Sequence, residues 1–339
     1  MLPAASSSPE ELADWLELRA IQSADRNSSI QDLVRALRRS GTTDALVDDE
    51  DDDDGDGGYA SDPGSEKVQA AAEGAFSEVE ERRAACAPSP DVSGYPFEVA
   101  DDYLSLSDGG EQHVYLFLLL LSIFGRDAGP GDVPGDDLFD DVCAEALKSY
   151  FGGPARTTAV VFGFPRRVFP AGFRAAVDQL CRNMGEGGSC RDRPTRKSQK
   201  DANLDIVAWR DFPDGRHGKL IGFGQCATGA NWQDKVTELL PQQFCQKWLS
   251  DFPTVLPIRT FFVPFRIERS RWSDTCIDAG IVFDRCRIAG SLHSPPVDLV
   301  RRCRKWVQHV VKNSMSGGAT AARVRAPRRR PSRKRRRAK

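Results

Sequence analysis

The pattern of apolar and polar residues divides the chain into a helix-rich first part and a second part in which strands and helices alternate. Apolar residues recur at helical spacing over residues 9–21, 30–39, 66–85, 114–124 and 138–150, and a short strand pair is expected at 95–107. Strand-like patterns then follow at 158–164, 204–209, 219–226, 257–265 and 280–287. Helices are expected between and after these strands at 172–184, 232–250 and 297–312.

The second part has the order helix, strand, strand, strand, helix, strand. A short turn at 211–215 predicts that the two central strands form a hairpin. The run 257–265 is apolar on both faces, which is typical of a parallel strand in the middle of a sheet. We therefore expect an α/β fold with a mixed central sheet at residues 136–312.

Composition divides the remaining residues into segments. A helical hairpin is expected at 1–46, an acidic linker at 47–65, an accessory region of helices and small strands at 66–135, and a basic tail at 313–339. The acidic linker and the basic tail have compositions that favour a solvated, disordered chain. The N-terminal helices are thus expected to form a flexibly joined appendage, available to a partner protein or to a second copy of the chain.

Cysteine usage and hydropathy restrict the class of protein. The nine cysteines include no Cys-x-x-Cys pair, and their number is odd. This argues for reduced, buried thiols and against a disulfide framework or a structural zinc site. The longest apolar run, 114–124, is too short to cross a bilayer. We therefore expect a cytoplasmic protein with no membrane partner.

Polar side chains are concentrated where the hairpin strands end. Asp205 opens one strand and Gln225 closes the other, so the hairpin brings them side by side. A carboxylate, an amide oxygen and the backbone carbonyl of Cys226 are suitable ligands for Mg²⁺, or for Mn²⁺. Lys235 is placed one turn into the next helix and can offset negative charge on a phosphate. The pattern predicts a metal site for phosphodiester hydrolysis.

These residues resemble the PD-(D/E)xK nuclease superfamily, which has the restriction-endonuclease-like fold. The family motif is an Asp on one central strand, followed on the next strand by Glu or Gln, any residue, and Lys. The resemblance covers about residues 136–290. It implies that Asp205 binds the metal, that Gln225 is the second motif residue in its Gln variant, and that Glu145 or Asp140 is the acid supplied by the first core helix.

One position departs from the motif, because Ala227 stands where the family has Lys. Some members of the family take the lysine from the following helix, and the resemblance then implies that role for Lys235. The stretch 224–229 is also similar to bacterial proteins of unassigned function. The resemblance as a whole implies a magnesium-dependent endodeoxyribonuclease that acts against foreign DNA, with a dimer favoured for cleavage of both strands.

Basic residues predict a nucleic-acid partner, DNA or RNA. Lysine and arginine clusters attract phosphate backbones without reading their sequence. The expected contacts lie in the polar loop 185–201 and in the C-terminal tail, at Arg191, Arg193, Arg196, Lys197, Lys200, Arg328, Arg329, Arg330, Arg335, Arg336 and Arg337.

Other interpretations fit the same residues. If Lys235 does not reach the site, the chain would be a catalytically impaired nuclease fold that acts as a DNA-binding or scaffold protein. Cys226, at a strand end before a helix, is a candidate nucleophile for a cysteine hydrolase. Glu145 has Lys148 three residues further on, which is the spacing of an ordinary surface ion pair.

Overall fold

The computed structural model describes residues 3–4, 6–45, 63–87, 94–107, 112–193 and 200–316. Most of the acidic linker expected at 47–65 lies outside these ranges. So do Arg196 and Lys197 of the polar loop, and the arginines proposed to bind nucleic acid in the tail: Arg328, Arg329, Arg330, Arg335, Arg336 and Arg337.

The N-terminal third of the chain combines three helices with a small antiparallel sheet. Its elements are α1 (Pro9–Gln22), β1 (Asn27–Ser29), α2 (Ile30–Ala45), α3 (Pro63–Ala85), β2 (Phe97–Ala100) and β3 (Tyr103–Leu106). Ser8 begins α1 with a capping box, in which its hydroxyl accepts from the Glu11 backbone and the Glu11 carboxylate accepts from the Ser8 backbone. The sheet has the order β1-β3-β2, so a strand that follows α1 pairs with one that follows α3.

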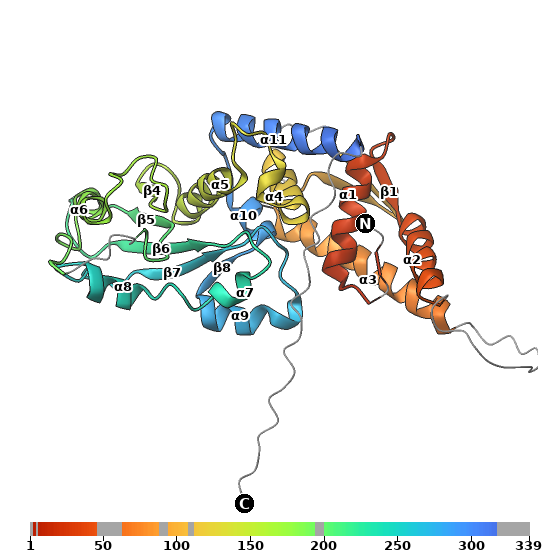
Figure 1. Ribbon diagram of the computed structural model, residues 1–339, viewed down its shortest axis with the longest axis horizontal. Helices are drawn as coiled ribbons and strands as arrows, with labels where there is room; N and C mark the ends of the chain where they lie inside the picture. The colour runs from red at the N-terminus through yellow and green to blue at the C-terminus, as the bar shows by residue number, and fades with distance from the viewer. Residues whose placement is uncertain are drawn as a thin grey trace, which may run out of the picture.

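These N-terminal elements are not a flexibly joined appendage. Leu16 of α1, Leu118 of α4 (His113–Phe124) and Trp306 of α11 (Val297–Met315) belong to one continuous buried core. The rings of Phe117 and Trp306 meet edge to face with their centroids 5.0 Å apart. In Figure 1, α11 extends along the top of the molecule from α5 (Gly135–Tyr150) to α1. The N-terminal helices and the α/β region therefore share packing that the sequence pattern did not reveal.

The rest of the chain forms the mixed sheet that was expected. It consists of β4 (Thr157–Val161), β5 (Ile206–Arg210), β6 (Leu220–Cys226), β7 (Ile258–Phe262) and β8 (Ile281–Phe283), in that order across the sheet. The first three strands are antiparallel neighbours, whereas β6, β7 and β8 run parallel. The expected α/β class is therefore confirmed, and so is the parallel strand at the centre of the run 257–265.

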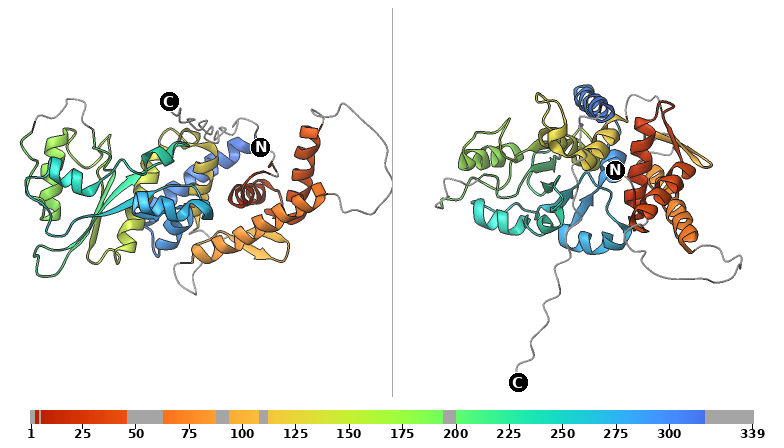
Figure 2. Two further views of the ribbon diagram at one scale, coloured as in Figure 1. Left: turned by 90° about the horizontal axis from the view of Figure 1, so that it is seen from below. Right: turned by 45° about the vertical axis from the view of Figure 1, so that its right-hand side comes forward.

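Helices cover both faces of this sheet. α5 (Gly135–Tyr150) packs on the face that carries Ile206 and Ala208, and α6 (Phe173–Met184) and α8 (Pro241–Trp248) pack on the face that carries Val207 and Trp209. The alternation along β5 follows from the two-residue period of a strand. The two views in Figure 2 show the sheet region at one end of the molecule and α1–α3 at the other.

Two segments differ from the expected elements. The helix expected at 232–250 is divided into α7 (Trp232–Lys235) and α8, because Pro241 has no backbone N–H to continue a helix and instead begins one. The strand expected at 280–287 ends at Phe283. There the Asp284 carboxylate accepts from the Arg287 N–H and begins helix α10 (Arg285–Ser291). The remaining elements are α9 (Trp272–Ala279) and two short 3₁₀ helices, Arg126–Ala128 and Arg269–Arg271.

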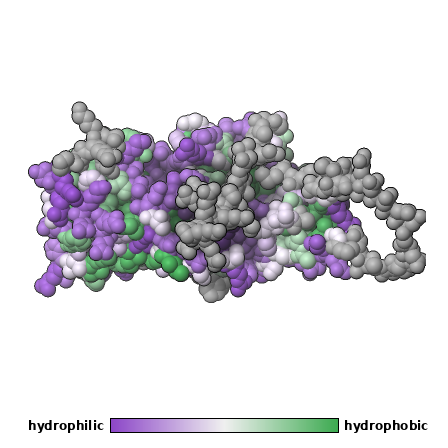
Figure 3. Space-filling model, turned by 60° about the horizontal axis from the view of Figure 1, so that its bottom comes forward, coloured by the Kyte–Doolittle hydropathy of each residue, from purple (hydrophilic) through white to green (hydrophobic). Residues whose placement is uncertain are grey.

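The surface is mixed in character. The face in Figure 3 is largely hydrophilic, with hydrophobic residues confined to patches. About half of each side chain is exposed at Phe252, Val255 and Leu256, between α8 and β7. Within the described ranges, no helix has the length and apolar character needed to cross a membrane.

Candidate metal-binding and catalytic site

Asp205 lies where three strands of the sheet meet. Its backbone carbonyl accepts hydrogen bonds from the N–H groups of Phe162 and Gly163 at 2.7 and 3.0 Å, and its own N–H donates to the Gly224 carbonyl at 2.9 Å. Its carboxylate Oδ2 accepts from the backbone N–H of Cys226 at 2.8 Å. Backbone and side chain are therefore both held by regular structure, which gives the carboxyl group a defined direction.

Asp140 of α5 approaches the same place beside Gly163. The point where a Cβ on Gly163 would lie is 3.2 Å from Oδ1 of Asp205 and 3.7 Å from Oδ2 of Asp140. Because residue 163 is glycine, no side chain fills the space between the two carboxyl groups. The two carboxyl groups thus lie close together beside Gly163, just after the end of β4.

The pKa values of both acids are raised. Desolvation on burial raises the pKa of Asp205 to about 7, and the carboxylates of Asp201 and Glu238 add to it, while the Cys226 N–H and the Lys235 ammonium group act in the opposite direction. Burial also raises the pKa of Asp140 well above its usual range, with a further contribution from Asp205. Neighbouring carboxylates that are partly removed from water repel each other, and a cation placed between them would relieve that repulsion.

The side-chain oxygen of Gln225 is buried and accepts no hydrogen bond from the described residues. In the β5–β6 register Ile206 pairs with Gly224, which places Asp205 opposite Gln225. The Gln225 amide Nε2 donates to Oε2 of Glu238 at 2.9 Å. Its Oε1 has no hydrogen-bond partner among the described residues, and the side chain is buried. An unsatisfied buried acceptor costs on the order of 1–3 kcal/mol, so this oxygen is poised for a ligand.

Lys235 is the residue expected to take the place of the motif lysine. It is the last residue of α7, and its positive charge acts on the Asp205 carboxyl, where it opposes the dominant effect of burial on the pKa. Ala227, at the motif position itself, is buried in an apolar cluster with Phe261 and Val263. The side chain of a lysine at position 227 would therefore start from an apolar environment. Lys235, by contrast, is placed so that its charge acts on Asp205.

The helix α5 contributes Asp140 to the site rather than Glu145. Glu145 accepts hydrogen bonds from Lys148 at 3.2 and 3.3 Å, and both side chains are about one quarter exposed. Of the two interpretations of Glu145, the structure shows the ordinary ion pair. The separation of five positions turns Glu145 away from the face of the helix that carries Asp140. A single sequence offers little signal for choosing between two acids on the same predicted helix.

Cys226 is partly buried, and its surroundings are those of an unreactive thiol. Burial raises its pKa well above the usual value, and the adjacent Cys143 thiol and the carboxyl groups of Asp140 and Asp205 raise it further. A reactive cysteine requires the opposite, because the nucleophile is the thiolate. The observed contribution of Cys226 to the site is the backbone N–H that holds Asp205.

The side chains at this site would supply only part of the coordination shell of a metal ion. Within the described ranges, no group of three or more His, Cys, Asp or Glu side chains is arranged to hold a metal ion. A cation here would be held by the two aspartates and the free amide oxygen of Gln225, with water completing its shell. Mg²⁺ commonly binds in this way through one or two carboxylates while it retains several waters, so the residues present fit this ion.

The basic residues expected to bind nucleic acid have different surroundings. The Arg191 guanidinium donates to the backbone carbonyl of Leu249 at 3.0 Å, which commits part of it to holding the loop. The Lys200 ammonium group lies 5.6 Å from the ring centroid of Phe164. Arg193 contributes its backbone carbonyl, which accepts from Arg174 at 2.8 Å. Among the three of these loop residues that the structure describes, Lys200 is thus the one whose charged group lies near Phe164, the residue after Gly163.

Comparisons with known proteins do not assign this arrangement to a family. No protein-family model matches the chain, no curated protein matches it significantly, and no solved structure does so either. The function must therefore be argued from the residues and their geometry.

Proposed function

We propose that this protein is a metal-dependent nuclease that hydrolyses phosphodiester bonds of DNA. The observation that carries the proposal is the proximity of the Asp140 and Asp205 carboxyl groups at Gly163, together with the buried oxygen of Gln225, which has no partner among the described residues and belongs to the residue opposite Asp205 in the sheet. Rigid oxygen ligands around a divalent cation are the usual means by which proteins bring a phosphate and an attacking water together. Mg²⁺ or Mn²⁺ is the cofactor proposed.

The order of elements supports the resemblance to the PD-(D/E)xK superfamily. Helix α5 is followed by β4, then by α6, then by the β5–β6 hairpin, then by α7 and α8, and then by β7 parallel to β6. Apart from α6, which stands between β4 and β5, this matches the helix, three strands, helix, strand order that the resemblance implies for a restriction-endonuclease-like core. Asp205 and Gln225 fall on the second and third of these strands or their ends, as the motif requires. We propose that fold for the region on this basis.

Each residue of the site has a proposed role. Asp140 and Asp205 hold the cation, and Gln225 adds its free Oε1. The cation would supply a Lewis acid for the phosphate and lower the pKa of the attacking water. Lys235 offsets the negative charge that develops on phosphate oxygens, a role that the buried Ala227 cannot fill. The Cys226 N–H keeps the Asp205 carboxylate in position.

The replacement of the motif lysine by Ala227 favours a second function, the binding of nucleic acid without cleavage. The site contains only two carboxyl ligands, and the motif lysine is replaced by Ala227. A protein with this core and no cleavage activity would bind nucleic acid and serve as a scaffold, with defence against foreign DNA or another process as its setting. Its N-terminal helices would then provide contacts to a partner protein or to a second copy of the chain.

Cleavage assays separate the two functions. The purified chain should cut plasmid or linear DNA with Mg²⁺ or Mn²⁺ and should lose this activity in EDTA, in Asp205→Ala and in Lys235→Ala. Lys148→Ala is a matched control, because that lysine lies on α5 and pairs with Glu145. Activity in Asp205→Ala equal to that of the parent would overturn the site. Binding of DNA by the parent without any cleavage would support the scaffold.

A further inference from the structure

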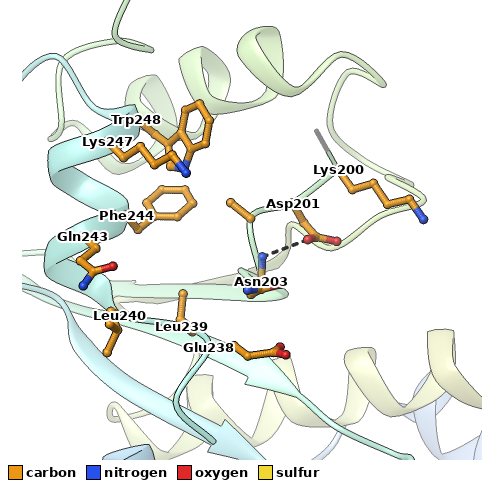
Figure 4. Close-up of a pocket in the computed structure, with 11 residues that line it drawn as sticks. Lys200, Asp201, Asn203, Glu238, Leu239, Leu240, Gln243, Phe244, Lys247 and Trp248 are labelled. Atoms are coloured by element: carbon orange, nitrogen blue, oxygen red, sulfur yellow. Dashed lines mark hydrogen bonds between the residues drawn. The ribbon is translucent and has the colours of Figure 1, made fainter. Parts of the chain in front are cut away.

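A pocket opens beside Asp205, between α8 and the residues that lead into β5. Its volume is about 420 Å³. Figure 4 shows Phe244 and Trp248 of α8 on one side and Asp201 and Asn203 on the other, with Glu238 at the edge nearest the sheet. Phe244 and Trp248 are almost fully buried, and the Lys247 ammonium group lies 4.9 Å from the centre of the Trp248 ring, so the two rings line the pocket but expose little apolar surface to it. The opposite wall is polar.

This pocket is continuous with the candidate site. Asp201 and Glu238 line the pocket, and the charges of both act on the Asp205 carboxyl. Glu238 also accepts the amide hydrogen bond of Gln225 at 2.9 Å. A group bound in the pocket would therefore lie beside the residues proposed to hold the cation, with Glu238 shared between the pocket and Gln225.

An exposed aromatic ring stands at the rim. Phe164 directly follows Gly163, its side chain is 47 % exposed, and its backbone N–H donates to Oδ2 of Asp201 at 3.4 Å. The ammonium group of Lys200 and the guanidinium group of Arg166 lie 5.6 and 5.9 Å from the centre of its ring. In Figure 4 the Lys200 side chain extends away from the pocket, which leaves the opening free. An exposed ring flanked by cations is typical of surfaces that bind single-stranded nucleic acid.

The chemistry of the pocket matches one nucleobase. A base is flat and apolar on its faces and carries donors and acceptors on its edges. Phe244 and Trp248 expose only small apolar areas to the pocket, whereas the Asp201 and Asn203 side chains, Glu238 and Lys247 offer donors and acceptors for the edge of a base. In a duplex those edges are paired and the bases are stacked, so only an unpaired base can enter. The volume of about 420 Å³ is within the range of pockets that hold small organic groups.

We propose that this pocket binds one unpaired nucleobase and that Phe164 stacks on the base next to it. The substrate class is then single-stranded or locally unpaired nucleic acid, with the adjoining phosphate directed to Asp140 and Asp205. This inference rests on the proposed nuclease function, and it adds the structural state of the strand that is cut.

The test is a comparison of binding in EDTA, where cleavage cannot contribute. Fluorescence anisotropy of the full chain with a labelled single strand of about 12 nucleotides, and with the duplex of the same sequence, measures the preference. The single strand should bind about tenfold more tightly than the duplex. Phe164→Ala should weaken single-strand binding about tenfold, because loss of one stacking platform commonly has an effect of this size, and should leave duplex binding nearly unchanged.

Phe212→Ala is the matched control. Phe212 is 57 % exposed and lies in the turn at the other end of β5, so its loss removes a similar ring from a different surface. Phe212→Ala should change neither the affinity for the single strand nor the affinity for the duplex. A 2-aminopurine base in the strand adds a second readout, because its emission should fall on stacking with the parent and fall less with Phe164→Ala.

The outcomes distinguish this inference from the proposed function. Equal effects of Phe164→Ala and Phe212→Ala, or tighter binding of duplex than of single strand, would overturn the base pocket. Metal-dependent cleavage of duplex that Phe164→Ala leaves intact would overturn it as well, while the nuclease function would stand. Single-strand preference lost in Phe164→Ala, in a chain that never cleaves, would support the pocket and remove the nuclease.

Discussion

The carboxyl groups of Asp140 and Asp205 both lie within 4 Å of the point where a Cβ on Gly163 would be, although one comes from a helix and the other from the start of a strand. The pKa of each is raised, chiefly by burial. Surrounding protein thus opposes the charged form of both acids, as is common where a cation or substrate completes a site. This relationship leads to predictions that do not depend on detecting cleavage.

Asp205→Asn should change the pH dependence of stability. A carboxyl whose folded pKa is about 7, against 3.8 in the unfolded chain, lowers stability as the pH rises from about 4 to 7, because the unfolded chain has already released the proton that the folded state retains. In EDTA, Asp205→Asn should therefore raise the free energy of unfolding more at pH 8 than at pH 5. The difference should be up to about 2–3 kcal/mol, an upper value because the side chain keeps some contact with water. Urea unfolding at both pH values measures it.

The control for that experiment is Asp274→Asn, since this acid lies in the first turn of α9, away from the site. Its effect on the free energy of unfolding should be similar at pH 5 and pH 8. A gain from Asp205→Asn that is the same at both pH values would show that the carboxyl ionises at its ordinary pH.

Asp140→Asn and Glu145→Gln should differ in their effect on metal binding. Asp140 faces Asp205, whereas Glu145 pairs with Lys148. Isothermal titration with Mn²⁺ should show an affinity at least about tenfold lower for Asp140→Asn and nearly unchanged for Glu145→Gln. Affinity in the parent should rise as the pH increases towards 7, because bound protons must leave the acids. The reverse order of the two variants would assign the helix ligand to Glu145.

Arg82→Met should strongly destabilise the fold. The Arg82 side chain is fully buried, and its guanidinium donates to Asp14, Glu17 and Glu78 at 2.7, 2.9 and 2.8 Å. Removal of one partner from a buried ionic network leaves uncompensated charges and costs about 3–5 kcal/mol. Chemical denaturation measures the loss.

Arg83→Met provides the comparison at the next position. Arg83 pairs with Glu80 at 3.1 Å on the surface, where both side chains are about half exposed. A surface pair of this kind contributes at most about 1 kcal/mol. Similar losses for Arg82→Met and Arg83→Met would contradict the buried network.

Gly222→Ala should destabilise the sheet where α5 packs on it. A Cβ at position 222 would lie 2.8 Å from Cζ of Phe151, a ring that is itself buried. Overpacking of this kind costs about 1–3 kcal/mol. Gly41→Ala should have the opposite sign, because that helical position has no heavy atom within 4 Å and alanine favours a helix by up to about 1 kcal/mol. Thermal unfolding of both variants tests the pair, and a neutral Gly222→Ala would show that Phe151 can move.

The sequence by itself was sufficient for the features that depend on short stretches of chain. A two-residue alternation on each side of a short turn predicts the β5–β6 hairpin, and a hairpin necessarily brings Asp205 near Gln225, because antiparallel register joins the two ends. The α/β class and the parallel strand β7 follow from hydrophobic patterning in the same way. The lysine expected from the next helix also acts on Asp205.

The pattern of apolar residues did not predict those helix and strand boundaries that depend on a single residue. A run of apolar residues could not show that Pro241 begins a new helix or that Asp284 ends β8 by capping α10. Each of these residues acts through a single hydrogen bond that is made or lost, which hydrophobic periodicity does not record.

Only the tertiary structure decided which side chains share an environment. It selected Asp140 over Glu145, because the rotation of α5 on the sheet determines which acid faces Gly163. It placed Ala227 in an apolar cluster, and it packed α1 and α3 around the buried Arg82. Secondary structure depends on contacts between residues close in sequence, whereas these placements depend on contacts between distant segments, which one sequence does not specify position by position.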